Sequence, residues 1–424
     1  MPRYYIKTYG CQMNIADSEA LAGVLESAGY QKTDDPKQAD ILLVNACVVR
    51  QNAEDKAAWY VTSAKGLRKT KPNLIIGLCG CIVTEPGRDI KTDFPHVDLF
   101  IPPNQPGKLE EFMTSLPHSP STSGRGGQDL RANGGEGITK YITIMHGCDN
   151  FCSYCVVPHV RGRESSRPVE EILDEIKKVD FNQYKEIFLL GQNVNSYKYG
   201  LANLLREIEK LTPSPHHSPL RTRFMTSHPK DMSDEIIQAV ADLPHVCEYF
   251  HLPIQHGDDE ILKSMNRGYN VDYYRKLVAK IRAKMQGAAI TSDIIVGYPG
   301  ESDRQFQNSL NIIREISFDA CNTAAYSTRP GTAAAKLEDS VPQKLKQERL
   351  QEIMKVVDEV TLANNDKLVG TSQEILVDRE DGGRTRTNKI VKFSQPNKGL
   401  LGQLVGVRIK SAKSWVLEGD IING

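Results

Sequence analysis

A run of three cysteines, Cys148, Cys152 and Cys155, constrains this chain more than any other feature. Their spacing is Cys-x3-Cys-x2-Cys, and no fourth cysteine lies near them to complete the tetrahedral set of a structural zinc site. Clusters that only transfer electrons are held by four protein ligands, whereas three thiolates leave one iron of a four-iron cluster open to a small molecule. The spacing therefore favours an iron–sulfur cluster that binds a guest molecule.

A chain of 424 residues is long enough for about three domains that each bury a core. It contains no apolar run of the roughly 18 residues that would span a bilayer, and its start lacks the apolar core of a signal peptide. We therefore expect a cytoplasmic protein without membrane contact, and we take it to act as a monomer. In a reducing compartment, nine cysteines are better explained by metal binding than by disulfides.

The first 114 residues alternate between strand and helix patterns. Apolar strand-like runs occur at Tyr4–Tyr9, Asp40–Asn45 and Asn73–Leu78, with helical patterns between them. This alternation predicts a parallel, doubly wound α/β sheet, in which ligands bind beyond the carboxyl ends of the strands.

Three more cysteines occupy that position. Cys11 follows the first strand, Cys47 the second and Cys81 the third, so we expect them to meet at one edge of the sheet. Such a trio predicts a second cluster with an open vertex, but buried cysteines are also often small core residues, and topology alone leaves both interpretations open. Cys79 lies within the apolar strand, and we assign it to the core.

Composition divides the rest of the chain. Residues 115–137 are rich in Ser, Gly and Pro and predict a flexible linker. From 138 to 363, six apolar runs alternate with helical patterns, which predicts a partial (β/α)6 barrel with its chemistry at the carboxyl ends of the strands. The short β-like runs from 364 to 424 predict a small all-β barrel.

Lys and Arg balance Asp and Glu at 53 each, but the last segment is uneven. Eight basic residues and no acidic one lie between Arg384 and Ser414, which predicts contact with phosphates, although a basic face with no partner is also common. The candidate RNA-binding residues are Arg384, Arg386, Lys389 and Lys392. A stacking role is one alternative for Trp415, but we expect this tryptophan to be buried in the core.

Several segments resemble the motifs of the radical S-adenosylmethionine (SAM) methylthiotransferases, and the likeness covers essentially the whole chain. The segments are Thr8–Asn14, Asn45–Cys47, Gly80–Cys81, Gly147–Pro158, Arg161–Pro168, Thr226–Lys230 and Tyr326–Thr332. The resemblance implies an N-terminal auxiliary-cluster domain, a central radical-SAM partial barrel and a C-terminal barrel of the TRAM type that holds RNA.

The same resemblance implies two [4Fe-4S] clusters and SAM as cofactors. The implied ligands are Cys11, Cys47 and Cys81 for the auxiliary cluster and Cys148, Cys152 and Cys155 for the SAM cluster. The residues expected to contact SAM are Gly191, Gln192, Asn193, Ser227, Val296 and Gly297. The implied reaction removes a hydrogen from carbon 2 of an adenine and adds a methylthio group there. No further catalytic residue is assigned.

Within the family, His251–Gln255 and Met265–Tyr269 are most similar to the tRNA-2-methylthio-N6-dimethylallyladenosine synthases. That branch implies an isopentenylated adenosine on the 3′ side of the anticodon as target, the tRNA anticodon stem-loop as partner, and flavodoxin or ferredoxin as electron donor. His256 is more similar to the branch that modifies an aspartate of ribosomal protein S12. That branch and the threonylcarbamoyl-adenosine branch are the alternatives, and a non-catalytic iron–sulfur RNA-binding protein is an alternative of another class.

Overall fold

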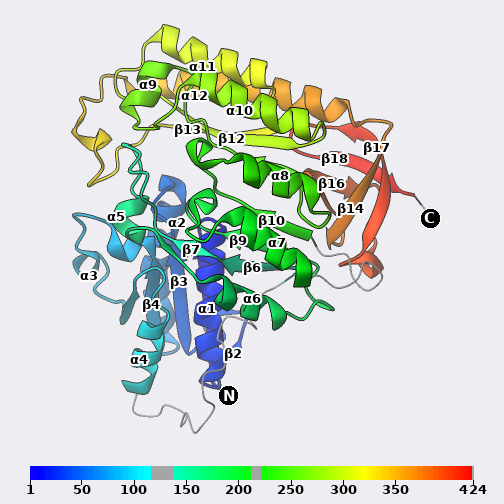
Figure 1. Cartoon of the computed structure of the whole chain (residues 1–424). Coiled ribbons are helices and arrows are strands. Elements are labelled where there is room, and N and C mark those ends of the chain that lie inside the picture. The colour runs from blue at the N-terminus through cyan, green and yellow to red at the C-terminus, as the bar shows by residue number, and fades with distance from the viewer. Residues whose placement is uncertain (116–136, 212–220, 423–424) are drawn as a thin grey trace.

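The computed structural model of the chain describes residues 1–115, 137–211 and 221–422. Figure 1 shows three parts in chain order: an N-terminal α/β domain from blue to cyan, a central α/β domain from green to orange, and a small β-barrel mostly in red. Residues 116–136, most of the predicted linker, lie outside the described residues. Within the described ranges, no helix is both long enough and apolar enough to cross a bilayer.

The N-terminal domain is the predicted parallel sheet. Its strands are β1 (Arg3–Tyr9), β2 (Gln31–Lys32), β3 (Ile41–Ala46), β4 (Ile75–Gly80) and β5 (Leu99–Ile101), in the order β2-β1-β3-β4-β5. Every strand pair is parallel. All residues of the central strand β3 are buried, which explains its apolar run Ile41–Val44. The helices are α1 (Gln12–Ser27), α2 (Gln51–Ala64), α3 (Ile90–Asp93) and α4 (Gly107–Ser115).

The central domain is a partial barrel built from two three-stranded parallel sheets. The strands are β6 (Thr139–Thr143), β9 (Glu186–Leu190) and β10 (Arg221–Phe224) in one sheet, and β11 (Tyr249–His251), β12 (Ala289–Val296) and β13 (Ala320–Ala325) in the other. An isolated bridge between Thr222 and Val246 connects the two sheets. Six parallel strands in this arrangement confirm the predicted partial barrel.

Helices pack on the outside of these strands in one large core that includes Leu189, Phe250 and Ile290. They are α6 (Val169–Lys177), α7 (Leu201–Leu211), α8 (Asp234–Asp242), α9 (Asp259–Ser264), α10 (Val271–Lys284), α11 (Asp303–Ile316) and α12 (Gln343–Asp366). Between β6 and α6 the chain forms a short hairpin and a short helix. These are β7 (Met145–His146), β8 (Ser165–Ser166) and α5 (Val157–Arg161). The run of three cysteines lies between β7 and α5.

The C-terminal domain is the predicted small barrel. Its strands are β14 (Ser372–Arg379), β15 (Gly382–Thr385), β16 (Ile390–Phe393), β17 (Leu404–Ala412) and β18 (Leu417–Ile421), closed in the order β14-β15-β16-β18-β17. Ile375, Val391 and Val407 belong to its buried core. A Cβ atom at Gly382 would stand 2.0 Å from the carbonyl oxygen of Val391, so only glycine allows this close strand contact.

Buried arginines fasten the C-terminal barrel to the beginning of the central strands. Arg221 and Arg223, in β10, donate hydrogen bonds to the carbonyl oxygens of Arg384 at 2.8 Å and Thr385 at 2.6 Å. Glu186, which begins β9, accepts from Arg223 at 2.5 Å and from Arg384 at 3.1 Å. Burial raises the pKa of Glu186, but the two arginines bring it below its ordinary value, so the carboxylate is charged. The C-terminal barrel therefore covers the end of the partial barrel where the strands begin.

Replacing Arg223 with methionine is expected to lower the free energy of unfolding by about 3–5 kcal/mol, because buried Glu186 would lose its closest partner. Urea denaturation of both proteins measures the difference. The control is Arg275→Met, which removes an exposed ion pair with Glu315 and leaves the free energy of unfolding unchanged within error. Equal stability of Arg223→Met and the wild type would contradict the fastening role.

Candidate functional site

The structure brings Cys11, Cys47 and Cys81 together at the carboxyl edge of the N-terminal sheet. Cys11 immediately precedes α1, Cys47 follows β3, and Cys81 follows β4. The thiol of Cys47 hydrogen-bonds the sulfur of Cys11, and this bond lowers the pKa of Cys11 to about 6. Gly10 permits the close approach, since a Cβ atom there would stand 2.8 Å from the Cβ of Cys47. One member of the trio is thus favoured as a thiolate, the form that binds metal.

A buried arginine from the central domain joins this trio. Arg161 ends α5, and its Nε donates to the Sγ of Cys81 at 3.2 Å. Its two terminal nitrogens donate to Asp17 at 2.7 Å and to Asn104 at 3.1 Å, both in the N-terminal domain. Burial raises the pKa of Cys81, and the positive guanidinium opposes that effect. The role of Arg161 was not predicted from the sequence. The one indication was that Arg161 begins the segment Arg161–Pro168, which resembles a motif of the family.

The second trio, Cys148, Cys152 and Cys155, lies beside another buried arginine. Burial and, to a smaller extent, the neighbouring Cys152 raise the pKa of Cys155 to about 12. Arg267 donates from Nη1 to the Sγ of Cys152 at 3.1 Å and from Nη2 to the carbonyl oxygen of Pro253 at 2.6 Å. In the described part of the chain, no carboxylate pairs with this guanidinium. A negatively charged cluster on the three thiolates would supply the missing anion.

The donor set of each trio fits an iron–sulfur cluster. Among the residues that the structure describes, no three His, Cys, Asp or Glu side chains are arranged around one metal ion. A cluster of several irons holds its thiolates farther apart than a single zinc ion does. Three thiols in each trio are the donor set expected for a four-iron cluster with one iron open to another ligand.

Polar atoms without partners lie at the ends of β9 and β10. Both amide atoms of Gln192, the Oγ of Ser227 and the Nε2 of His228 are buried and have no hydrogen-bond partner within the described ranges. A buried polar group left unpaired costs about 1–3 kcal/mol, so a ligand that pairs with these atoms is favoured. SAM offers amino, carboxylate and hydroxyl groups that match them.

His228 lies near Arg267, the arginine beside the second trio. Its Nδ1 accepts the backbone N–H of Lys230 at 3.3 Å, which leaves the proton of the neutral ring on the unpaired Nε2. Burial lowers the pKa of His228 to about 2, and the nearby charge of Arg267 contributes, so the ring stays neutral. His228 was not predicted from the sequence, although it follows the predicted SAM contact Ser227 directly.

Two other predicted SAM contacts, Asn193 and Gly191, have structural roles next to these unpaired atoms. Asn193 donates to Asp231 at 2.7 Å and accepts the backbone N–H of His228 at 3.0 Å. A Cβ atom at Gly191 would stand 2.5 Å from the side chain of Met145, so glycine is required for the close packing. Both residues position their neighbours, and a direct contact with SAM stays a prediction for them.

The predicted contacts Val296 and Gly297 lie where β12 ends. The N–H of Gly297 donates to the carboxylate of Glu301, which also accepts from His256 at 2.9 Å and from Arg349 at 2.8 Å. All the side chains of this network are buried. His256 therefore braces the loop that follows β12, and this structural role explains it without reference to a substrate.

One cavity of about 600 Å³ is lined by all three domains. Its walls come from residues 49–52 after Cys47, residues 154–156 in the second trio's loop, strands β12 and β13, helix α12, and Trp415. This volume is within the usual range for small-molecule sites. The segments that carry both cysteine trios thus border the same space.

The expectation that Trp415 is buried in the core was wrong. Its side chain is 51% exposed, and its Nε1 donates to the carboxylate of Asp358 at 2.9 Å. The residue belongs to the turn between β17 and β18, where no core position is available.

Three of the four candidate RNA-binding residues hold domains together. The ion pairs are Arg384 with Glu186, Arg386 with Glu248, and Lys389 with Asp319. These pairs join the C-terminal barrel to the central domain, so the structure does not favour phosphate contact by these three side chains. Lys392 is 53% exposed, 3.8 Å from Asp381, and stays a candidate.

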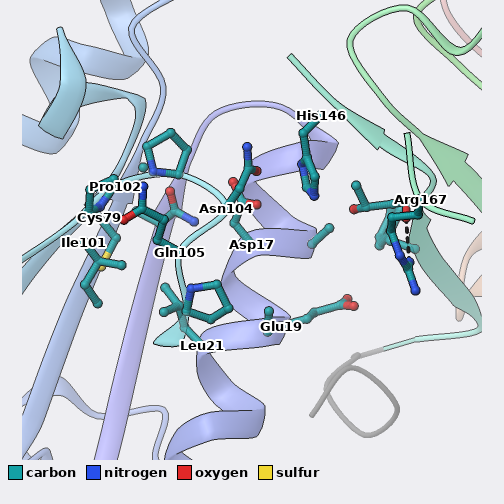
Figure 2. Close-up of a pocket in the computed structure, with 18 of the residues that line it drawn as sticks. Asp17, Glu19, Leu21, Cys79, Ile101, Pro102, Asn104, Gln105, His146 and Arg167 are labelled. Carbon is teal, nitrogen blue, oxygen red and sulfur yellow. Dashed lines mark hydrogen bonds between the residues drawn. The ribbon is translucent and has the colours of Figure 1, made fainter. Parts of the chain in front are cut away.

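Figure 2 shows a second pocket, of about 90 Å³, between α1 and the loop after β5. The labelled polar side chains around it are Asp17, Glu19, Asn104, Gln105, His146 and Arg167. Cys79 lies in its wall but is only 1% exposed, and burial raises the pKa of its thiol. Cys79 packs in a different core cluster from Cys81, which agrees with its assignment to the core.

Comparison with known proteins identifies the family. Three family models match: the radical SAM superfamily over residues 142–313, the uncharacterized protein family UPF0004 over 3–102, and the TRAM domain over 366–422. The tRNA-2-methylthio-N(6)-dimethylallyladenosine synthase of Acetivibrio thermocellus is 42% identical, covering 99% of this chain and 91% of that protein. The synthase of Carboxydothermus hydrogenoformans is 40% identical, covering 99% of both. The chain belongs to the family of the tRNA-2-methylthio-N(6)-dimethylallyladenosine synthases. It is a radical SAM enzyme, with an iron–sulfur cluster and SAM as cofactors.

Solved structures share the fold. The radical SAM methyltransferase TsrM from Kitasatospora setae, with tryptophan and a SAM analogue bound, has a TM-score of 0.58 at 14% identity, covering 89% of this chain and 79% of that one. The cobalamin-dependent radical enzyme OxsB has a TM-score of 0.52 at 11% identity, covering 84% and 56%. At these identities the likeness concerns the fold alone.

We expect iron content to separate the two trios. Replacing Cys11, Cys47 and Cys81 together by alanine should remove about half of the iron bound after anaerobic reconstitution, because we expect each trio to hold one cluster. The same replacement of Cys148, Cys152 and Cys155 should remove the other half. Colorimetric iron analysis measures both. Cys79→Ala is the matched control and should keep the full iron content. A triple variant that kept the full iron content would contradict the assignment of its trio.

Proposed function

We propose that this enzyme adds a methylthio group to carbon 2 of N6-dimethylallyl-adenosine, on the 3′ side of the tRNA anticodon. Relatives at 40–42% identity are named for the synthesis of this nucleoside. The observation that carries the proposal is the single cavity bordered by the segments of both cysteine trios. A reaction that breaks a C–H bond and forms a C–S bond at one carbon requires both functions at one place.

Each trio would hold one [4Fe-4S] cluster. The SAM cluster is assigned to Cys148, Cys152 and Cys155, and the auxiliary cluster to Cys11, Cys47 and Cys81. When bound, the clusters and SAM supply a 5′-deoxyadenosyl radical able to remove the hydrogen from carbon 2, together with the sulfur and the methyl group to be added. The closeness of the thiols within each trio and the arginine beside it support this assignment.

The protein's own side chains bind and orient these groups. Arg267 and Arg161 each direct a guanidinium nitrogen at one sulfur of a trio, which stabilises negative charge there. Gln192, Ser227 and the neutral His228 offer buried donors and acceptors to the polar groups of SAM. Each of these contacts would hold a reacting group in place, which is the contribution that the protein makes to the rate.

The tRNA anticodon stem-loop is the proposed partner. An unpaired loop base requires less free energy to leave the stack and enter a cavity than a paired base does. The match to the TRAM domain and the exposed Lys392 support contact with RNA at the C-terminal barrel. We further propose flavodoxin or ferredoxin as the electron donor, and a monomer that acts in the cytoplasm.

The alternatives are less well supported. His256, the residue most similar to the ribosomal-protein branch, has a structural role in a buried network. The relatives compared above are named as dimethylallyladenosine synthases rather than as enzymes of the S12 or threonylcarbamoyl-adenosine branches. Membership of a radical SAM enzyme family also argues against a non-catalytic RNA-binding protein.

Single cysteine variants should separate the two half-reactions. Cys152→Ala is expected to abolish reductive cleavage of SAM and therefore all product. Cys47→Ala is expected to retain SAM cleavage but to form no methylthio-adenosine, because only the auxiliary trio is damaged. Reverse-phase chromatography of 5′-deoxyadenosine and mass spectrometry of the RNA nucleosides measure the two reactions. Methylthio-adenosine from the Cys47 variant would disprove the role of the auxiliary trio.

A further inference from the structure

An exposed tryptophan is held rigidly at the wall of the main cavity. Besides the bond from its indole to Asp358, the turn that carries Trp415 is anchored by Asn365 in α12. The side-chain nitrogen of Asn365 donates to the carbonyl oxygens of Lys413 at 2.9 Å and Ser414 at 3.1 Å. One hydrogen bond thus holds the half-exposed aromatic ring, and two more hold the turn that carries it. A preset apolar surface of this kind is suited to binding an apolar or aromatic group.

Other exposed apolar side chains line the same cavity. Met354 lies one helical turn before Asp358 in α12 and is 48% exposed, while Val49, from the loop that follows Cys47, is 49% exposed. Apolar surface left in water is unfavourable, and covering it with an apolar ligand group is favourable. Methionine adapts its shape readily, which suits a branched hydrocarbon chain. We refer to Trp415, Met354 and Val49 as the apolar rim.

Polar groups on the barrel strands complement the apolar rim. Asp293 of β12 accepts a hydrogen bond from Asn322 of β13 at 2.9 Å, and its other carboxylate oxygen is 3.4 Å from the Nε2 of His251. Asp293 and Asn322 both line the cavity. A carboxylate accepts the N6–H that adenine retains after alkylation, whereas it would repel the carbonyl oxygen that guanine has at the same position.

We propose that the apolar rim binds the dimethylallyl group and that Asp293 binds the N6–H of the same base, so that Trp415 and Met354 determine the preference for prenylated RNA. The inference rests on the proposed function and deepens it, because it assigns the residues that distinguish the substrate from unmodified adenosine. The group to be recognised is a short branched hydrocarbon attached to N6, and the cavity presents its apolar surfaces and its carboxylate together.

The test is a comparison of RNA binding by the cluster-loaded full chain. Fluorescein-labelled anticodon stem-loops, one with N6-dimethylallyl-adenosine and one with adenosine, are titrated by fluorescence anisotropy in the absence of oxygen. The wild type should prefer the prenylated RNA. Trp415→Ala and Met354→Ala should each reduce the ratio of the two dissociation constants about ten-fold, because a lost apolar contact affects only the prenylated RNA. Asp293→Asn should weaken the binding of both RNAs by a similar factor, because both carry an N6–H.

Trp59→Ala is the matched control, since Trp59 is 71% exposed on α2 and does not line the cavity. Its preference should equal that of the wild type. Trp415→Phe keeps an aromatic ring and should retain most of the preference, which excludes misfolding as the cause of the Trp415→Ala result. A Trp415→Ala variant with unchanged preference would overturn the inference while leaving the proposed function in place. A wild type without preference would also overturn the inference, whereas the proposed function is tested separately by the methylthio-adenosine that the wild type forms.

Discussion

A buried guanidinium joins the two halves of the site. Arg161 ends α5, the helix that follows the second cysteine trio, and its guanidinium lies between Cys81 and Asp17 of the N-terminal domain. A second buried arginine, Arg329, makes a parallel contact from the central domain to Glu54 at 3.2 Å. A desolvated cation has few stable positions away from its partners, so these contacts fix how the two domains face each other. The shared cavity depends on that orientation.

The C-terminal barrel is attached by the same kind of contact at the opposite end of the central strands. Arg221 and Arg223 point out of the central domain, and Arg384 and Arg386 point into it, with Glu186 between them. This attachment lets the turn that carries Trp415 reach the main cavity, although most of the barrel lies where the strands begin (Figure 1). The three domains therefore act as one frame around one space, and sequences far apart in the chain contribute to its walls.

The sequence predicted the elements that follow from regular rules. Parallel strands bring their carboxyl ends to one edge, so the meeting of Cys11, Cys47 and Cys81 could be expected from topology. The sequence did not predict that Arg384 and Arg386 point toward the central domain. A count of charges does not show which side of a strand faces a carboxylate in another domain. The exposure of Trp415 was missed for a similar reason: burial is the commoner fate of a tryptophan, and only the closed barrel shows that this one lies in a turn.

The central claim is that two clusters, each on its own trio, face one cavity. The most direct measurement is electron paramagnetic resonance of the reduced, SAM-bound enzyme, with spin relaxation recorded for the cluster on Cys148, Cys152 and Cys155. Two paramagnetic clusters at one cavity should relax each other, so relaxation is predicted to be faster in the wild type than in a variant with Cys11, Cys47 and Cys81 all replaced by alanine. Identical relaxation in the two proteins, with both clusters present and reduced in the wild type, would contradict this account.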